Sequence, residues 1–190
     1  FLLDTAQKNA LSLGLKNITF VHGDALDEKT VKQLKQCDII FCDTERPVGE
    51  GRRTLETIKP NPVQLIATYS PITPKIAIEL PPFLRDIPIA GEKEYLSVHG
   101  ALNRLTLYCG SLAKVEKSVV LLPENIRLES SGKTMNPVKE LKSWKYLYTL
   151  NPAIVQADLF GEVNESLGGK LELYVHEKKY YFFGNKPILS

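Results

Sequence analysis

The first part of the chain shows two periodicities of apolar residues. Residues 2–13 carry apolar side chains at three- and four-residue spacing, which predicts an amphipathic helix that ends at Gly14. The β-branched run 18–21 predicts a short strand. Residues 27–36 predict a second helix, with Asp27 as its N-cap. Helix and strand therefore alternate from the start.

The same alternation continues through the next segment. Residues 38–42 predict a second strand, in the middle of a parallel sheet. A charged loop with glycines follows, and Asn61-Pro62 predicts a helix start, because asparagine caps and proline fits the first helical position. Residues 75–80 predict a third strand. This pattern is typical of a doubly wound α/β sheet.

The pattern changes after residue 90. Residues 94–98 and 101–109 flank His99-Gly100 and predict a hairpin. Residues 118–122 predict a further strand at the far edge of the same sheet. The polar stretch that follows, 124–137, is the best candidate for a linker.

The last part of the chain predicts a small α+β unit. Asn151-Pro152 repeats the capping signal before a helix with apolar residues from 153 to 160. Gly168-Gly169 ends it, and residues 171–176 and 180–183 predict a terminal hairpin. We therefore expect an α/β domain over residues 1–122, a linker over 123–134 and a small α+β domain over 135–190.

Aromatic side chains are frequent in this last unit. The run 180–183 could stack nucleic-acid bases, but alternation along a strand favours a half-core, half-surface strand. Trp144, Tyr146 and Tyr148 share one strand face by their spacing, and we expect them in the core.

Composition and charge exclude several classes. The chain has 190 residues, 43% of them hydrophobic, enough for one full-sized domain or one domain with a small appendage. A net charge of +2 forces no polyelectrolyte partner. No apolar run is long enough for a bilayer, so we expect no membrane partner. Three cysteines without a C-x-x-C motif indicate a cytoplasmic protein, and the histidines lack the spacing of metal ligands, so we expect no metal.

The beginning of the chain is unusual. Its first residue is Phe1, its only methionine is Met135, and it opens inside an apolar stripe without a capping residue. We therefore expect that part of the protein precedes Phe1. A sheet that lacks its first strands would expose an edge strand, which predicts a homodimer through that edge.

Two carboxylates stand at the ends of neighbouring predicted strands. Gly23-Asp24-Ala25 follows the first strand, and Asp43 ends the second. Ligands of open α/β sheets bind beyond such carboxyl ends, so the two aspartates should line one crevice. Asp24 could accept a hydrogen bond from an amino group, and the small Ala25 leaves room for a flat ring. Alternatively, Asp24 only caps a turn, and Asp43 caps the loop or pairs with an arginine.

The loop after Asp43 carries a cluster of arginines. Arg46, Arg52 and Arg53 could contact the phosphates of RNA. A solvated loop without a partner is the alternative. Cys42, next to Asp43, is expected to be a small buried residue and not a nucleophile.

Residues 6–25, with Gly14-Leu15 and Gly23-Asp24-Ala25, resemble the middle of a class I S-adenosylmethionine-dependent methyltransferase. The resemblance implies that Gly23, Asp24 and Ala25 abut the adenine of the cofactor. It also implies that Asp43 and Arg46 stand beside the transferable methyl, where the family has an Asp-Pro-Pro-like motif.

The resemblance extends to residues 75–82, 94–108 and 150–157, which look like a group that joins a methyltransferase domain to a C-terminal THUMP-like domain. It implies an α/β fold: a partial Rossmann-like methyltransferase sheet followed by a small α+β domain. It also implies S-adenosylmethionine as cofactor and RNA as a partner.

The chain departs from this family in two ways. The glycine-rich cofactor loop is absent, so we expect this chain to bind the cofactor weakly or not at all and to be inactive by itself. Thr44 replaces the expected proline, which argues against N-methylation of a nucleobase by the usual geometry. The second hypothesis is a non-catalytic RNA- or protein-binding module that keeps the fold.

Overall fold

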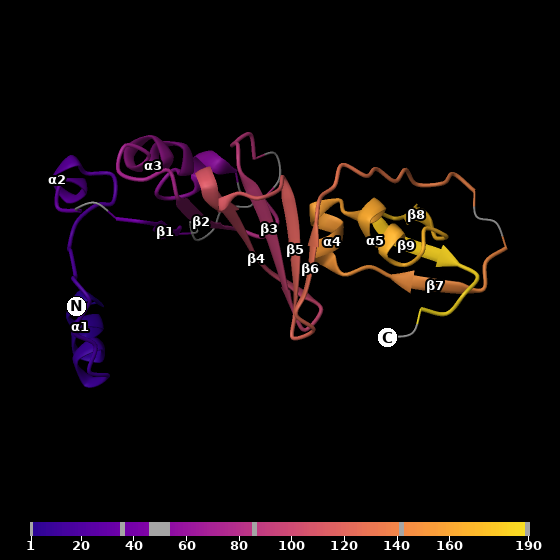
Figure 1. The fold of residues 1–190 in the computed structure, drawn as a ribbon, viewed down its shortest axis with the longest axis horizontal. Coiled ribbons are helices and arrows are strands. Elements are labelled where there is room, and N and C mark those ends of the chain that lie inside the picture. Colours follow the sequence, from indigo (N-terminus) through magenta and orange to yellow (C-terminus); the bar gives the residue numbers. More distant parts are fainter. Residues whose placement is uncertain (1, 35–36, 46–53, 85–86, 141–142, 189–190) are drawn as a thin grey trace.

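The computed structural model describes residues 2–34, 37–45, 54–84, 87–140 and 143–188. They form an elongated molecule with two sheets, in which α1 (Leu2–Ser12) projects from one end and the smaller sheet forms the other (Figure 1). The larger sheet has six strands in the order β1-β2-β4-β3-β5-β6, and the smaller has three in the order β7-β9-β8. The α/β fold class is confirmed.

The larger sheet is mixed. Its strands are β1 (Ile40–Asp43), β2 (Ile76–Leu80), β3 (Glu92–Val98), β4 (Ala101–Tyr108), β5 (Lys117–Leu122) and β6 (Ile126–Glu129). β1 runs parallel to β2, and β3 runs parallel to β5. The predicted hairpin is β3–β4, with positive φ at His99 and Gly100, and it folds back so that β4 lies between β2 and β3.

Short helices and turns connect the strands. They are α2 (Glu28–Val31), α3 (Pro62–Tyr69), α4 (Pro152–Ala157), α5 (Phe160–Ser166) and 3₁₀ turns at Leu55–Thr57 and Gly110–Leu112. The predicted caps are present: Asp27 accepts from Lys29 N, Asn61 from Val63 N and Gln64 N, and Asn151 from Ala153 N. Each cap satisfies amide donors that the first turn leaves free.

The smaller sheet packs onto the larger one through α4 and α5. It consists of β7 (Tyr146–Thr149), β8 (Glu172–His176) and β9 (Lys179–Gly184). One continuous buried core includes Ile78 and Leu105 of the first sheet and Ile154 and Phe182 of the second unit. Asn151 Nδ2 also donates to Ser97 Oγ at 2.9 Å, which joins the cap of α4 to β3.

The predicted strand at residues 18–21 is wrong. This segment has no strand pairing, and Ile18 is 45% exposed. A β-branched run becomes a strand only where its backbone finds a partner, and the described part of the chain supplies none here.

β1 is not in the middle of the sheet, as its apolar sequence predicted. It forms an edge, paired with β2 in the described residues, and Phe41 is 61% exposed. At the other side, the strands expected toward the far edge of the same sheet are present, although β5 itself is an interior strand. The far edge is β6.

Two expectations for the second half need correction. The stretch expected as a linker contains β6, which pairs antiparallel with β5 and completes the first sheet. The helix expected over residues 153–160 breaks at Asp158, whose φ of 58° is left-handed, so that α4 and α5 are separate.

The aromatic residues of the smaller sheet divide between its two faces. Phe182 is buried and Tyr180 packs on the core, whereas Tyr181 does not, so the half-core prediction is confirmed. Tyr148 packs on the core as expected. Tyr146 is 40% exposed, so the prediction that it lies in the core is wrong.

Candidate functional site

The first wall of the candidate site is the turn at Gly23–Leu26. Asp24 Oδ1 accepts from Leu26 N at 2.8 Å, which closes the turn on its own side chain. A Cβ at Gly23 would lie 2.2 Å from Thr30 Oγ1, so any larger residue here would have to displace the Thr30 side chain of α2. The turn-capping alternative for Asp24 is therefore present in the structure.

Tyr69 fixes this turn against α3. Its hydroxyl donates to Ala25 O at 2.7 Å across a separation of 44 residues. Burial raises the pKa of Tyr69, and the nearby Cys42 and Asp24 raise it further, so the hydroxyl keeps the proton that it donates. The loop at Asp24 and Ala25 is thus held by the helix that follows β1.

The second wall begins at the carboxyl end of β1. Asp43 ends the strand with an exposed side chain, and Thr44 follows with a buried one. Thr44 Oγ1 donates to Glu79 O of β2 at 2.6 Å. Thr44 therefore anchors the backbone after Asp43 by a hydrogen bond.

The charged loop is closed at its base. Glu45 N donates to Lys59 O at 2.7 Å, and Ile58 is 2% exposed. These contacts hold the two ends of the loop together. Arg46, Arg52 and Arg53 lie outside the described residues.

The two walls enclose one cavity of about 700 Å³. Its lining combines the turn, the end of β1, the base of the loop and the start of α3: Asp24, Ala25, Leu26, Asp43, Glu45, Glu56, Ile58, Lys59, Pro60, Asn61 and Gln64. Asp24 and Asp43 thus share a crevice, although one wall is a turn and not the end of a paired strand. Gly23 belongs to the turn and lies against Thr30, but it does not line the cavity.

The cavity is strongly acidic. Among the residues that the structure describes, its ionisable lining consists of Asp24, Asp43, Glu45 and Glu56 against Lys59. A hydrogen bond with the Thr54 side chain lowers the pKa of Glu56 and keeps it ionised. These described charges favour a cationic ligand.

Cys42 is half-buried beside Asp43 and is not an activated nucleophile. Burial raises the pKa of its thiol, and the charge of Asp43 raises it further. Across the described ranges, no group of histidine, cysteine, aspartate or glutamate side chains could hold a metal ion. None of the described helices is long and apolar enough to cross a membrane.

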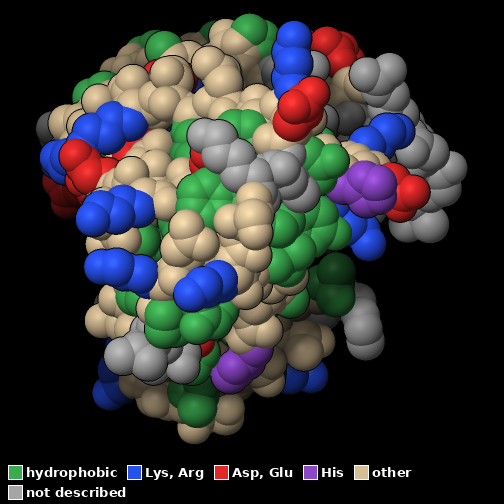
Figure 2. Space-filling model, turned by 90° about the vertical axis from the view of Figure 1, so that its right-hand side faces the viewer, with side chains coloured by type: hydrophobic (Ala, Val, Ile, Leu, Met, Phe, Trp, Pro, Cys, Tyr) green, Lys and Arg blue, Asp and Glu red, His purple; other side chains and the backbone are tan. Residues whose placement is uncertain are grey.

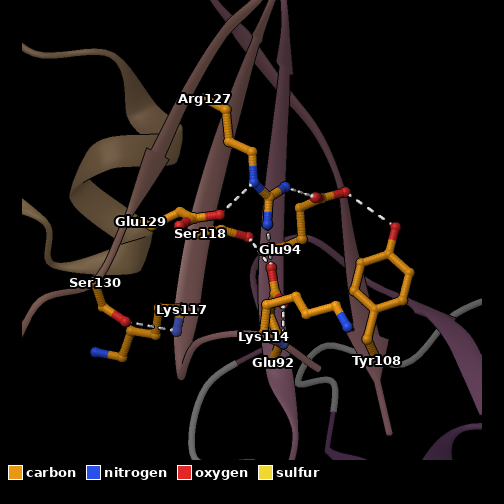
Figure 3. Close-up of polar contacts among 9 residues, drawn as sticks. All are labelled: Glu92, Glu94, Tyr108, Lys114, Lys117, Ser118, Arg127, Glu129 and Ser130. Carbon is orange, nitrogen blue, oxygen red and sulfur yellow. Dashed lines mark hydrogen bonds and ion pairs between the residues drawn. The ribbon is translucent and has the colours of Figure 1, made fainter. Parts of the chain in front are cut away.

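A second polar cluster, absent from the sequence predictions, lies on the larger sheet (Figure 3). Arg127 of β6 points between Glu92 and Glu94 of β3 and Glu129 of its own strand, and forms ion pairs with all three. Ser118 Oγ donates to Glu92 Oε1 at 2.6 Å from β5. The cluster therefore connects three neighbouring strands.

Glu92 is the buried member of this cluster, with its side chain 2% exposed. Burial alone would raise the pKa of Glu92, but hydrogen bonds from Ser118, Lys114 N and Arg127 outweigh it and the net pKa is lowered. The ion pairs likewise raise the pKa of Arg127 despite its partial burial. Arg127 and the three glutamates are paired with one another, which is typical of a structural network and not of a reactive site.

The sequence carried only a weak signal for this cluster. Glu92 and Glu94, like Arg127 and Glu129, lie two positions apart and so share a strand face. Which strands would be neighbours depends on the order of the sheet, and that order could not be read from local patterns.

The comparisons with known proteins show the fold. The chain is similar to the crystal structure of a protein from Porphyromonas gingivalis W83 that is proposed to be a methyltransferase, with a TM-score of 0.69 and 16% identity. The similarity covers 97% of this chain and 49% of that protein, so the chain spans about half of its length. No family model matches the chain, and no curated protein matches its sequence. The predicted methyltransferase-like fold is therefore confirmed as a fold.

Proposed function

We propose that the protein transfers a methyl group from S-adenosylmethionine and that the acidic cavity forms part of its cofactor and acceptor site. The observation that carries this proposal is the shared crevice of Asp24 and Asp43 in a chain with a methyltransferase-like fold. The C-terminal unit, residues 135–190, would be the THUMP-like part, and RNA the class of acceptor.

The residues of the cavity fit the cofactor chemically. S-adenosylmethionine supplies a methyl group already activated on a positively charged sulfonium, and four carboxylates against one lysine favour such a cation. The volume of about 700 Å³ lies within the range of small-molecule sites. Gly23 and Ala25 leave the turn without bulky side chains.

Asp24 can serve the turn and the cofactor at once. Its Oδ1 accepts from Leu26 N, while no described residue donates to its Oδ2. That second oxygen would accept from the amino group of adenine. Ala25 O already accepts from the Tyr69 hydroxyl, so we assign the recognition of the amino group to the side chain of Asp24.

Asp43 would form the acceptor side, together with Arg46. Methyl transfer from a sulfonium needs little acid–base chemistry, so the work of these residues would be to align the nucleophile with the methyl group. The contact of Thr44 with β2 holds the backbone at Asp43 in place.

Isothermal titration of the full-length protein with S-adenosylmethionine tests this function, using Asp24→Asn as the variant. Asparagine keeps an oxygen for Leu26 N but removes the second acceptor. We expect the affinity to fall about ten-fold or more, as for the loss of one hydrogen bond to a charged group.

The control is Asp27→Asn. Asp27 caps its backbone in the same way, by accepting from Lys29 N at 3.1 Å, but it does not line the cavity. It should leave the affinity unchanged. An unchanged affinity in Asp24→Asn would mean that the cofactor lies elsewhere, and no heat at high micromolar cofactor would favour the non-catalytic binding module.

A further inference from the structure

A further cavity lies in the C-terminal unit, where α5 ends and the chain leaves β9. Its volume of about 510 Å³ lies within the range of small-molecule sites. It shares no described lining residue with the acidic cavity. We call it the indole pocket, because one of its walls is a tryptophan. Its described apolar lining consists of Trp144, Leu167, Leu171, Pro187 and Ile188.

Trp144 forms the first wall of the indole pocket, just before β7. Its Nε1 donates to Glu172 Oε2 of β8 at 3.2 Å, which fixes the polar edge of the indole. The next residue, Lys145, donates its N–H to Gly184 O of β9 at 3.2 Å and ties the backbone down as well. The indole is half-buried, so part of its apolar surface is available to a ligand.

The turn after α5 forms the second wall. Gly168 and Gly169 have positive φ values of 93° and 69°, and Gly169 N donates to Asn164 O at 2.7 Å, which ends the helix. Asn164 Oδ1 then accepts from Leu171 N at 3.0 Å. Leu171 packs on the core, whereas Leu167 is 41% exposed. The turn therefore presents one fixed and one accessible leucine to the pocket.

The chain that follows β9 forms the third wall. A Cβ at Gly184 would lie 2.7 Å from Leu171 Cδ2, so the end of β9 approaches this leucine closely. The Tyr148 hydroxyl donates to Lys186 O, which holds the chain beyond β9 against β7. Ile188 of the same stretch is 36% exposed. Hydrogen bonds thus tie all three walls, and a preformed pocket loses little freedom when it binds a ligand.

The described charges of the indole pocket are positive. Lys170 and Lys186 are the ionisable residues of its described lining, and both are exposed. Neither forms an ion pair with another described residue. Glu172 lies at the outer edge of Trp144, through its hydrogen bond, and does not line the pocket. Figure 2, which faces this end of the molecule, shows hydrophobic side chains exposed among Lys and Arg side chains.

We propose that the indole pocket binds an amphipathic carboxylate of the class of medium-chain fatty acids. The tail lies against Trp144, Leu167 and Leu171, where it removes apolar surface from water. Lys170 and Lys186 bind the carboxylate at the mouth, because a lysine stem lies along an apolar wall while its ammonium stays in water. The two lysines select against a cationic head group and leave a neutral one without an ionic partner.

The single tryptophan of the chain reports on this pocket directly, because Trp144 is part of its lining. The emission of Trp144 is followed while the full chain is titrated with sodium decanoate, below the concentration at which decanoate forms micelles. We expect a saturable change with one decanoate per chain. Decanol has the same tail without the charge and should bind about ten-fold more weakly. Decyltrimethylammonium should not bind.

Two variants of the pocket and one matched control complete the test. Leu167→Asp should weaken decanoate binding about ten-fold or more, because it places a carboxylate in the apolar wall. Lys186→Glu should weaken it about ten-fold by reversing a charge at the mouth, and it leaves the apolar wall intact. Lys179→Glu makes the same charge change at an exposed lysine of β9 that does not line the pocket, and it should leave the affinity unchanged.

Several results would overturn the proposal. These are no change in the emission of Trp144, the parent affinity in Leu167→Asp or Lys186→Glu, equal affinity for decanol and decanoate, or an equal loss in Lys179→Glu. A response to phosphatidylglycerol vesicles as large as the response to decanoate would also overturn it, because it would identify a membrane-binding face. The assay contains no S-adenosylmethionine, so its outcome is independent of the titration with the cofactor.

Discussion

At the scale of single residues, Arg127 neutralises a buried carboxylate although its own side chain is partly exposed. Its side chain is 38% exposed, yet one of its partners, Glu92, has a side chain that is 2% exposed. A buried carboxylate that loses its cation becomes a buried, uncompensated charge. The stability of the larger sheet therefore depends on a residue of its short edge strand β6.

We predict that Arg127→Ala lowers the free energy of unfolding by about 3 kcal/mol, since breaking a buried pair costs far more than the pair itself contributes. Urea denaturation followed by circular dichroism measures this loss. Arg104→Ala is the control, because Arg104 pairs with Glu79 at 3.1 Å with its own side chain 44% exposed. This pair is closer to a surface pair, and its loss should cost about 1 kcal/mol or less. Equal losses in the two variants would contradict the structural role of Arg127.

Asp24 shows why residue types predict a site only in part. The sequence left two readings for it, a turn cap or a cofactor contact, as alternatives. In the structure Oδ1 makes the cap and Oδ2 faces no described donor, so the two roles do not compete. For Arg46, Arg52 and Arg53, by contrast, the expected contact with phosphate rests on the sequence alone.

At the scale of elements, the sequence predicted the helix caps and the hairpin turn, which depend only on residues close together in the chain. Asn61 and Asn151 cap α3 and α4, and His99-Gly100 turns the β3–β4 hairpin, because each device acts within a few residues. The strand expected at residues 18–21 did not form, and β6 formed in a polar stretch. Both depend on whether a distant strand offers its backbone, which no short pattern encodes.

The break between α4 and α5 was missed for the same reason. Asp158 adopts a left-handed φ of 58°, and Leu159 N donates back to Ile154 O at 3.2 Å, which ends α4 as a Schellman motif does. Leu159 is 2% exposed, so the turn is driven by burial of the next residue. Aspartate tolerates this conformation better than most residues but not as well as glycine.

We predict that Asp158→Gly is more stable than Asp158→Ala by about 1 kcal/mol, because only glycine takes the left-handed region without a Cβ penalty. Thermal or urea unfolding of the two variants measures the difference. The same pair of substitutions at Gln156, inside α4, should give the reverse order, with alanine about 1 kcal/mol more stable. Alanine equal to or better than glycine at residue 158 would mean that the turn relaxes.

At the scale of the whole molecule, two surfaces of opposite character lie at the two parts of the chain. The acidic cavity belongs to the first sheet, and exposed lysines such as Lys145 and Lys179 lie on or beside the strands of the small sheet. One continuous core joins the two sheets, so we expect the two surfaces to keep a fixed position relative to each other.

The edge strand β1 is the basis for the expectation that the chain forms a homodimer. Ile40 N donates to Lys75 O, so the backbone groups of the next residue, Phe41, point away from β2 toward the edge. Ile39 and Phe41 are 54% and 61% exposed beside these groups. An apolar edge strand with free donors and acceptors can pair with its own copy about a two-fold axis, which makes the contact self-complementary.

We therefore predict that the 190-residue chain forms a dimer at micromolar concentrations through antiparallel pairing of β1 with β1. Phe41→Lys should shift it to monomer, because a lysine on an edge strand opposes pairing with an identical lysine. Sedimentation velocity over a concentration series measures the state. Phe83→Lys changes the charge of an equally exposed phenylalanine away from the edge and should remain dimeric. A dimer that survives Phe41→Lys would place the contact elsewhere, and a monomer at every concentration would show that β1 is protected without a second copy.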